Sequence, residues 1–257
     1  MPRGEERRMQ ALGIDIGGTG IKGAPVDLAT GKLLAERKKI ATPHPATPKA
    51  VPQVVREVAQ SFRWTGAVGV TFPGVVTGGT IRTAANVDES WIGTDAAALF
   101  GKATGADVVV LNDADAAGLA EVTFGAGVGV KGTALMLTFG TGVGSALFTD
   151  GTLVPNTEFG HIEIRGKDAE KRASEHAKVA HDWGWKDWTE RVSEYLRHME
   201  VLLSPDLIIV GGGISKEAAT WVPMLTGVQA KVVPATMHND AGIVGGAMAA
   251  AGLATAE

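Results

Sequence analysis

The stretch Leu12–Lys22, LGIDIGGTGIK, decides the fold. Its apolar residues alternate with small or polar ones, stop at a glycine-rich turn and resume beyond it. Short apolar runs on both sides of such a turn predict a β-hairpin, because glycine tolerates the positive φ angles of tight turns. A turn without side chains also bares its backbone N–H groups, which suit phosphate oxygens. For one such turn alone, a surface hairpin with glycines for tightness is an equal alternative.

Polar side chains flank this turn. The Thr19 hydroxyl and the Lys22 ammonium would add donors to a phosphate site. Asp15 stands at the end of the first strand, where a carboxylate suits a Mg²⁺ ion that accompanies phosphate, directly or through water. We therefore expect the first phosphate-binding residues to be Asp15, Gly17, Gly18, Thr19, Gly20 and Lys22.

A second copy of the pattern favours the phosphate interpretation. Leu135–Phe148, LMLTFGTGVGSALF, is again an apolar run, a glycine turn and another apolar run. Two hairpins of one design predict a duplicated βββ unit with two phosphate-binding turns. In the second turn we expect Gly140, Thr141 and Gly142 to bind phosphate.

The remaining order of elements alternates strands with helices. We expect further strands at 33–40, 67–72, 107–111, 207–210 and 228–233, and helices at 51–62, 95–102, 113–124, 168–180, 187–203, 216–222 and from 241. This alternation predicts two α/β layers with mixed sheets and a cleft between them. We expect domains at 12–125 and 126–257, a hinge at 125–131, and a last helix that is a candidate to pack back on the first domain.

Composition limits the function classes. The chain has 257 residues, of which 45% are hydrophobic and 20% charged, as in a soluble globular protein. The net charge of −4 argues against a broad nucleic-acid-binding face. The absence of cysteine excludes disulfides, thiolate catalysis and cysteine zinc sites. With no apolar signal segment at the start and no apolar run of about 20 residues, we expect a cytoplasmic protein without a membrane partner.

Two common nucleotide motifs do not fit. In the segment from Gly140, Ser145 occupies the third glycine position of a dinucleotide fingerprint, and the residues that follow predict a strand where the fingerprint requires a helix. Neither the segment from Gly17 nor that from Gly127 has the Gly-Lys-Ser/Thr ending of a P-loop. The chain is therefore neither a Rossmann enzyme nor a P-loop NTPase.

Taken together, the motifs resemble a known family. DIGGTGIK, LTFGTGVGS and LIIVGGGIS (Leu207–Ser215) resemble the phosphate-1, phosphate-2 and adenosine motifs of the sugar kinase–actin superfamily, and EFGH (Glu158–His161) is typical of its ROK family. The resemblance implies a two-domain α/β fold of the sugar kinase–actin (ribonuclease H-like) class, with a duplicated βββαβα core and an interdomain cleft. It also implies that Gly211, Gly212 and Gly213 contact the nucleotide.

One departure from the family narrows the resemblance. ROK kinases usually carry a cysteine-rich zinc loop after Glu-x-Gly-His, but here the segment is IEIRGKDAEKRAS, so we expect no zinc site. This segment resembles a zinc-free branch of polyphosphate/ATP glucokinases. The resemblance implies transfer of a terminal phosphoryl group from polyphosphate or ATP, with Mg²⁺, to the 6-hydroxyl of glucose. Mannose as a second acceptor and the preferred donor stay open.

Asp113 is the candidate catalytic residue. It follows the expected strand 107–111 and begins a helix, so an ordinary helix N-cap is the plain alternative. Ligands lie at the carboxyl ends of strands in such layers, and a carboxylate there can accept the proton of an attacking hydroxyl. The resembling kinases place their general base here and the preceding Asn on the sugar, which implies these roles for Asp113 and Asn112. Asp115 is the second candidate.

The sugar contacts are implied by the resemblance. Glu158 and His161 would bind vicinal hydroxyls, although a hydrogen-bonded surface loop is the plain alternative. Glu170 aligns with the end of the zinc loop, whose Glu also binds sugar. Asn86 and Gly74 would complete the sugar pocket, and both could equally be turn residues.

Several alternatives stay open. Trp183, Trp185 and Trp188 are given a packing role, not a site role. Polyphosphate requires basic residues along its path, and the candidates are Lys131, Arg165, Lys167, Lys171, Arg172 and Lys216. The nearest enzymatic rival is an ATP-dependent kinase for an N-acylhexosamine, and the non-enzymatic one is an actin- or chaperone-like nucleotide-binding protein. A sugar-sensing repressor would need a helix-turn-helix, for which eleven residues before the first strand leave no room.

Overall fold

The computed structural model describes residues 10–84 and 87–252. The chain divides into two units, the first formed by Met1–Ala120 with Asn239–Glu257 and the second by Glu121–His238. Within the described residues, none of the helices combines the length and apolarity that crossing a membrane requires.

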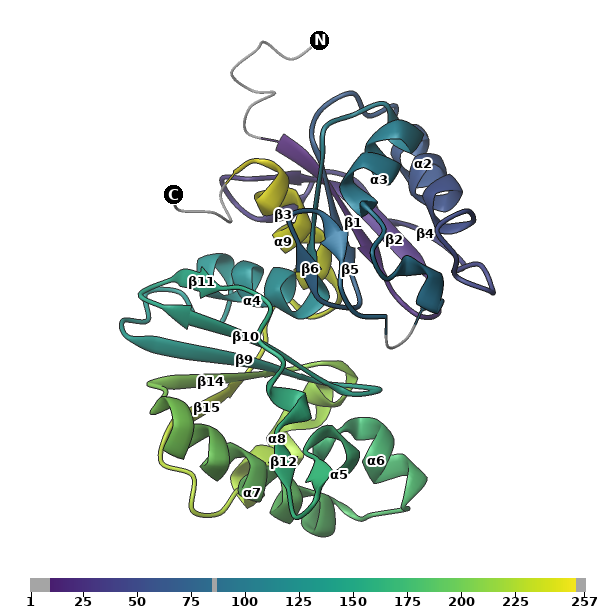
Figure 1. Cartoon of the computed structure of the whole chain (residues 1–257). Helices are drawn as coiled ribbons and strands as arrows, with labels where there is room; N and C mark the ends of the chain where they lie inside the picture. Colours follow the sequence, from purple (N-terminus) through teal and green to yellow (C-terminus); the bar gives the residue numbers. More distant parts are fainter. Residues whose placement is uncertain (1–9, 85–86, 253–257) are drawn as a thin grey trace. The chain divides into compact units, whose positions relative to one another are not determined.

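The first unit is built on a mixed sheet (Figure 1). Its strand order is β3-β2-β1-β5-β8, and β4 pairs with β2. Strands β1 and β2 form the expected antiparallel hairpin, whereas β5 runs parallel to both β1 and β8. The strands are β1 (Gln10–Ile16), β2 (Ile21–Asp27), β3 (Lys32–Leu33), β4 (Lys38–Ile40), β5 (Val68–Phe72) and β8 (Val108–Asn112).

Helices cover both faces of this sheet. Residues of α2 (Val51–Ser61) and α3 (Ala96–Thr104) share a core with Leu12 and Ile14. Gly13 lies between those two and faces the opposite side, since side chains alternate along a strand. There a Cβ on Gly13 would overlap the Ile243 carbonyl of α9 (Ala241–Ala250).

Close approach of α9 depends on several glycines. A Cβ on Gly69 would overlap the Gly246 carbonyl, and one on Gly245 would overlap the Ala116 carbonyl of α4 (Asp113–Phe124). The apolar C-terminal stretch is therefore a buried helix of the first unit. A small hairpin of β6 (Val76–Thr77) and β7 (Thr80–Ile81) completes this unit.

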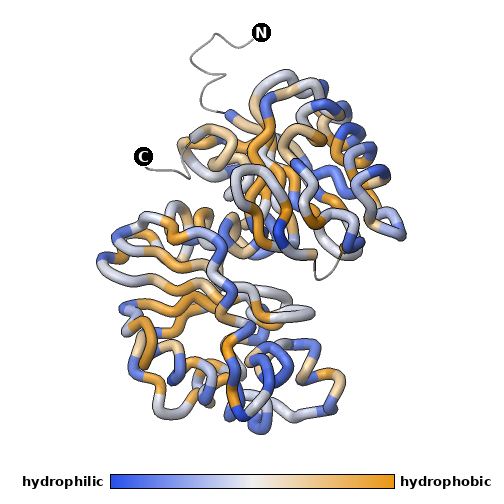
Figure 2. Tube along the Cα trace, in the orientation of Figure 1, coloured by the Kyte–Doolittle hydropathy of each residue, from blue (hydrophilic) through white to orange (hydrophobic). Residues whose placement is uncertain are grey.

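The second unit repeats the design of the first. Its sheet has the order β11-β10-β9-β14-β15, with an antiparallel hairpin of β9 and β10 and parallel pairs of β14 with β9 and β15. The predicted duplicated core is confirmed. The strands are β9 (Thr133–Phe139), β10 (Val143–Thr149), β11 (Thr152–Val154), β14 (Leu207–Gly211) and β15 (Lys231–Pro234). Figure 2 shows apolar residues concentrated along the strands of both sheets.

An aromatic cluster fills the core of the second unit. Phe139 meets the rings of Trp188, Tyr195 and Trp221 edge-on, with centroids 6.0, 6.4 and 6.1 Å away. Trp185 packs edge-on against Trp188. The helices here are α5 (Glu170–Ala173), α6 (Glu175–Ala180), α7 (Trp185–Leu203) and α8 (Ala218–Trp221), and β12 (Glu163–Ile164) pairs with β13 (Lys167–Asp168).

Four expected elements differ from the structure. The strand expected at 33–40 is two short strands, β3 and β4. The helix expected at 168–180 is two helices, because Ser174 ends α5 and caps α6 by accepting from the Ala177 N–H. The helix expected at 216–222 is a 3-10 helix (Gly213–Glu217), the short α8 and a second 3-10 helix (Val222–Met224) that contains Pro223. Because proline has no N–H, Pro223 cannot donate to the carbonyl of Ala219 and so cannot continue α8 as a regular helix.

The fourth difference is the start of β15 at Lys231, three residues later than the strand expected at 228–233. The N–H groups of Gln229 and Ala230 both donate to Glu200 Oε1 at 2.6 Å, so these two residues are not available to a strand ladder.

Candidate functional site

The first glycine turn connects β1 and β2. The Gly17 N–H donates to the Gly20 carbonyl at 3.1 Å, and the Thr42 hydroxyl donates to the Gly17 carbonyl at 2.5 Å. Gly18 and Thr19, at the tip, are exposed. A Cβ on Gly20 would lie 2.6 Å from Cε of Lys39, so this lysine lies directly against the turn. The base of the turn is fixed by Thr42 and contacted by Lys39, and its tip is exposed, as a phosphate site requires.

Asp15 and Lys22 face each other across this hairpin. They are register partners, and Lys22 Nζ lies 2.9 Å from Asp15 Oδ2. The Thr71 hydroxyl, on the neighbouring strand β5, donates to Asp15 Oδ1 at 2.8 Å. The position of the Asp15 carboxylate is therefore defined from two sides. Thr71 is fully buried, and sequence analysis did not identify it.

Asn112 and Asp113 join β8 to α4. Asn112 Oδ1 accepts from the N–H groups of Ala114 at 2.8 Å and Asp115 at 3.1 Å, so Asn112 is the residue that caps the helix. Its Nδ2 donates to the Gly74 carbonyl at 3.1 Å. Asp113 is exposed, and its Oδ1 also accepts from the Ala114 N–H. The N-cap role that was the plain alternative for Asp113 is thus filled by Asn112.

Gly74 and Asp115 are two further candidates of the first unit. A Cβ on Gly74 would overlap the Thr83 carbonyl, so a close backbone approach requires glycine there. Asp115 is buried, unlike Asp113. Asn86, predicted as a sugar contact, lies outside the described residues.

The second glycine turn lies in the second unit, between β9 and β10. The Gly140 N–H donates to the Gly142 carbonyl at 3.0 Å, and the Gly140 carbonyl accepts from the His176 N–H at 3.0 Å. Thr141 is exposed at the tip. A Cβ on Gly142 would overlap the carboxylate of Glu170, which also accepts from the Val143 N–H at 3.2 Å.

The segment around Glu158 is fixed to β10. Buried Ser145 donates to the Thr157 carbonyl at 2.7 Å and accepts from the Phe159 N–H at 3.0 Å. A Cβ on Gly160 would overlap the Val143 carbonyl, which accounts for glycine within Glu-x-Gly-His. Burial raises the pKa of the Glu158 carboxyl; the charge of His161 opposes this shift and that of Glu170 adds to it.

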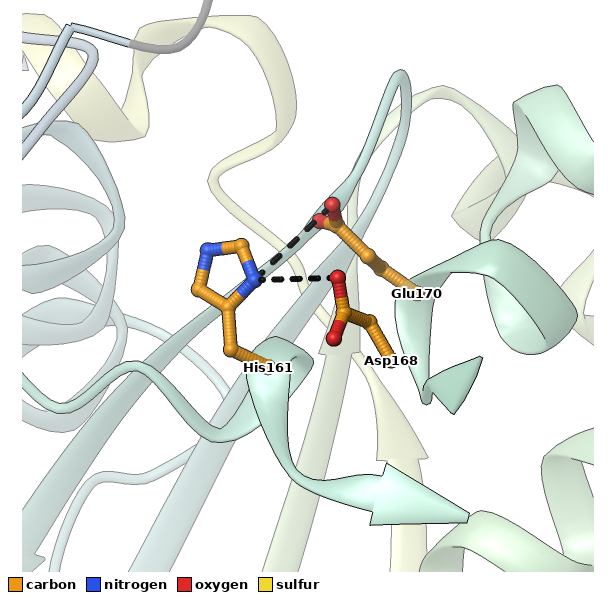
Figure 3. Close-up of side chains that lie close together, drawn as sticks. All are labelled: His161, Asp168 and Glu170. Carbon is orange, nitrogen blue, oxygen red and sulfur yellow. Dashed lines mark ion pairs between the residues drawn. The ribbon is translucent and has the colours of Figure 1, made fainter. Parts of the chain in front are cut away.

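His161 lies among carboxylates. Its Nε2 is 3.8 Å from Glu158 Oε2, and its Nδ1 is 3.9 Å from Asp168 Oδ2 and 4.0 Å from Glu170 Oε1 (Figure 3). Glu158, His161 and Glu170, which were singled out from the sequence, are therefore brought together. Asp168 was not predicted, although its place two residues before Glu170 could have suggested it.

The same cluster has the dimensions of a cation site. Ligand atoms of His161, Asp168 and Glu170 all lie within 4.8 Å of one another. Lys171 Nζ, however, lies 3.2 Å from Asp168 Oδ2 and already supplies a positive charge there. That this chain uses no zinc therefore stays a prediction.

The glycine triplet follows β14. Gly212 has a φ of +84°, and a Cβ there would overlap the Phe139 carbonyl, so the backbone itself requires glycine. Gly211 packs against Met136, and Gly213 lies close to the carboxylate of Glu175. The nucleotide role of the triplet stays a prediction.

The chain was compared with known proteins. Residues 11–176 match the profile of the ROK family. The polyphosphate glucokinase of Mycobacterium tuberculosis (strain CDC 1551 / Oshkosh) is 53% identical over 247 residues, which cover 96% of this chain and 93% of that protein. The polyphosphate glucokinase of Mycobacterium leprae (strain TN) is 50% identical, with coverage of 96% and 76%.

Solved structures agree with these matches. The inorganic polyphosphate/ATP-glucomannokinase of Arthrobacter sp. strain KM has a TM-score of 0.90 at 50% identity, over 94% of this chain and 98% of that one. A ROK family glucokinase from Streptomyces griseus, solved in complex with glucose and AMPPNP, has a TM-score of 0.78 at 25% identity, over 93% and 98%. The match to the family profile covers more than half of this chain, and the mycobacterial relatives match nearly all of it. The chain belongs to the ROK family.

Proposed function

We propose that this chain is a polyphosphate- and ATP-dependent glucokinase that transfers a terminal phosphoryl group to the 6-hydroxyl of glucose, with mannose as a second acceptor. The observation that carries the proposal is 53% identity, over 96% of this chain and 93% of the relative, to a polyphosphate glucokinase. The match to a polyphosphate/ATP-glucomannokinase, at a TM-score of 0.90, supports both donors and the second acceptor.

Asp113 is the proposed general base. An exposed carboxylate at the carboxyl end of a strand can accept the proton of the attacking sugar hydroxyl. Asn112 caps α4 by accepting from the N–H groups of Ala114 and Asp115, and Asp113 shares only the first of these donors. The cap on the Asp115 N–H is therefore kept when the Asp113 side chain serves the reaction.

The two glycine turns are the proposed sites for donor phosphates. Both end an antiparallel hairpin and both expose a threonine at the tip, Thr19 in one and Thr141 in the other. Phosphate oxygens would accept from backbone N–H groups and these hydroxyls. Lys22 would add a positive charge to offset the charge on the transferred group.

Mg²⁺ is the proposed cofactor, and Asp15 the residue that would hold it. The Asp15 carboxylate offers the hard oxygen ligands that Mg²⁺ prefers, and its contacts with Lys22 and Thr71 leave lone pairs for ordered water. Since Mg²⁺ usually keeps several waters, the residue fits a water-mediated site. When bound, the ion would neutralise charge on the donor phosphates.

Glu158, His161 and Glu170 are the proposed sugar contacts of the second unit, and Asn112, Gly74 and Asn86 those of the first. Carboxylate oxygens and an imidazole suit a ligand with several adjacent hydroxyls, because each hydroxyl both donates and accepts. Ser145 and Gly160 fix the segment that carries Glu158 and His161.

A matrix of acceptors and donors tests the proposal. Glucose, mannose and two N-acylhexosamines would each be assayed with ATP and with long-chain polyphosphate. We expect sugar 6-phosphate from glucose and mannose with both donors. Activity confined to N-acylhexosamines, or no transfer to any sugar, would contradict the proposal.

A further inference from the structure

A charged pocket of about 460 Å³ lies beside α7 in the second unit. Arg165, Arg172, Glu190, Arg191, Glu194, Arg197 and Thr226 line it, and they are called the arginine pocket here. Four arginines against two glutamates leave a local surplus of positive charge in a chain whose net charge is −4. We propose that the arginine pocket binds the distal part of an inorganic polyphosphate chain, an inference that rests on the proposed function.

Two of the arginines are held by one carboxylate. Arg165 Nε lies 2.6 Å from Glu194 Oε1, and Arg172 Nη2 lies 2.7 Å from Glu194 Oε2. Burial acts to raise the pKa of Glu194, but hydrogen bonds from Arg165 and Arg172 and their charges lower it overall. Each of these contacts uses one nitrogen of a guanidinium that has three, so N–H donors remain for an anion.

The other two arginines carry uncompensated charge. Arg191 lies over the Trp183 ring, 3.9 Å from its centroid, and also donates to the Asp187 carbonyl. Arg197 Nη1 donates to the Thr226 carbonyl at 2.6 Å. In the part of the chain that the structure describes, neither arginine has an ion-pair partner. Both guanidinium groups are thus oriented by neutral groups while their charges stay available.

The lining selects for a phosphate chain over a nucleotide. Every residue of the lining except Thr226 is charged, so the pocket surface is mainly polar and lacks an apolar side chain on which a flat base would pack. Guanidinium groups match phosphate oxygens in geometry as well as charge. A polymer that presents negative charge at each repeat and has no flat group is the donor chemistry that this lining fits.

The arginine pocket lies away from the second glycine turn. A polyphosphate chain whose reacting end is at the turn would therefore reach the pocket with its distal part. On α5, Glu170 bonds the Val143 N–H at that turn, whereas Arg172 faces Glu194 in the pocket. Two residues along a helix correspond to a rotation of about 200° around its axis. The turn and the pocket therefore lie on opposite sides of α5. Only an extended donor would reach both, so the effect should depend on chain length.

Three variants test the inference. Arg191→Gln/Arg197→Gln removes the two uncompensated charges, Glu190→Gln removes a negative charge from the same pocket, and Arg56→Gln/Lys102→Gln removes two exposed charges of the first unit. The probes are long-chain polyphosphate, tripolyphosphate and ATP. The readouts are direct binding by calorimetry without sugar, and KM with glucose.

We expect Arg191→Gln/Arg197→Gln to raise Kd and KM for long-chain polyphosphate about tenfold, while ATP and tripolyphosphate change less than about twofold. Glu190→Gln should shift long-chain binding in the opposite direction, and the control variant should match the parent. The two pocket variants should thus change long-chain affinity in opposite directions. This distinguishes a ligand site from damage to the fold, which would weaken the binding of all three probes alike.

Two results would overturn the inference: long-chain binding that is unchanged in Arg191→Gln/Arg197→Gln, or an equal loss for all three probes. Calorimetry also separates this inference from the proposed function. Charge-dependent binding of long-chain polyphosphate by a protein that phosphorylates no sugar would support the pocket and contradict the glucokinase.

Discussion

Glu170 Oε2 accepts a hydrogen bond from the Val143 N–H at 3.2 Å, so a single carboxylate joins α5 to the second glycine turn. The other oxygen of Glu170 lies 4.0 Å from His161 Nδ1. The turn proposed for donor phosphate and a histidine proposed for sugar are thus supported by one side chain. Changes at Glu170 should affect both substrates, and to different extents.

We predict that Glu170→Ala raises KM for glucose and for the phosphoryl donor by about threefold to tenfold each, since one hydrogen bond contributes about 0.5–1.5 kcal/mol. Glu170→Gln keeps an oxygen that can accept from Val143 and loses the charge. It should therefore raise KM for glucose and leave the donor KM near that of the parent. Steady-state kinetics with each substrate varied in turn would check this. Equal effects of the two variants on the donor would contradict the supporting role.

Asp113→Asn should lower turnover by about 10²–10⁴-fold, because the amide keeps the shape of the side chain and cannot accept the proton. Glucose affinity, measured by calorimetry, should change little. The thermal midpoint should also change little, because Asn112 and not Asp113 caps α4. Turnover within a few-fold of the parent would exclude Asp113 as the base.

Asn112→Ala is the matched variant for this prediction. It removes the acceptor of two helix N–H groups and the donor to the Gly74 carbonyl. We expect it to lower the free energy of unfolding by about 1–2 kcal/mol, as the loss of a helix cap does. The two adjacent residues should thus differ: Asp113→Asn lowers turnover, whereas Asn112→Ala lowers stability and, because Asn112 is a proposed sugar contact, also raises KM for glucose.

Glu158 should make glucose binding sensitive to acid. The ionised carboxylate accepts hydrogen bonds that the protonated form cannot, and burial raises its pKa above the ordinary value of 4.5. Glucose affinity should therefore start to fall at a higher pH than an ordinary glutamate would produce. Calorimetry across pH would show this in the parent. Glu158→Gln should bind glucose weakly at every pH, and an identical pH profile in this variant would assign the titration to another group.

The same raised pKa has a consequence for stability. A folded pKa above the unfolded value means that the fold favours protonated Glu158. The stability that protonation contributes is therefore fully present below the unfolded pKa, and it is lost as pH rises through the folded pKa. At neutral pH, Glu158→Gln should thus unfold at a slightly higher temperature than the parent. The difference should be small, because the side chain is 35% exposed and solvent screens its charge. It should disappear in acid.

The core of the fold was predictable from local patterns. Two glycine turns between apolar runs predicted both hairpins. Thr94 and Asp95, which precede an apolar run, were both candidates for the cap of α3, and Asp95 is the cap, accepting from the Ala98 N–H at 2.9 Å. These features depend on residues close together in the sequence. Pro223 is also a local signal; its effect on the helix expected at 216–222 was missed.

Features that depend on distant contacts were not predictable. Glu121 is fully buried and accepts from the nearby Ala126 N–H and from the N–H groups of Thr236 and Met237, which lie more than a hundred residues further along the chain. Nothing in the helical pattern of α4 distinguishes it from a surface glutamate. Thr71 was missed for the same reason, because its bond to Asp15 crosses from one strand to another. The roles of the site residues in turnover stay predictions.

A chelator selective for zinc should leave activity unchanged. The chain has no cysteine, and Lys171 Nζ lies 3.2 Å from Asp168 Oδ2, so a positive charge already neutralises one arm of the cluster around His161. Elemental analysis of the purified protein should find no stoichiometric zinc. Activity that is lost to the chelator and restored by zinc alone, with Mg²⁺ held constant, would contradict this prediction.

Salt should separate the two donors. ATP and polyphosphate present the same reacting phosphoryl group, but polyphosphate continues as a charged chain whose condensed counterions are released on binding, as they are from single-stranded nucleic acid. Of the six basic residues proposed along its path, all except Arg172 are exposed. A chain that contacts three or four such charges should lose affinity by about twentyfold to fiftyfold when salt is raised fourfold.

We therefore expect KM for long-chain polyphosphate to rise steeply with potassium chloride at constant free Mg²⁺, while KM for ATP rises by a few-fold at most. Lys131→Glu/Lys216→Glu should weaken polyphosphate use at low salt and flatten its salt dependence, because fewer counterions are released when fewer cations are contacted. ATP kinetics in this variant provide the control for folding. Equal salt slopes for the two donors in the parent would exclude a basic path for the chain, and the reacting end alone would then determine donor binding.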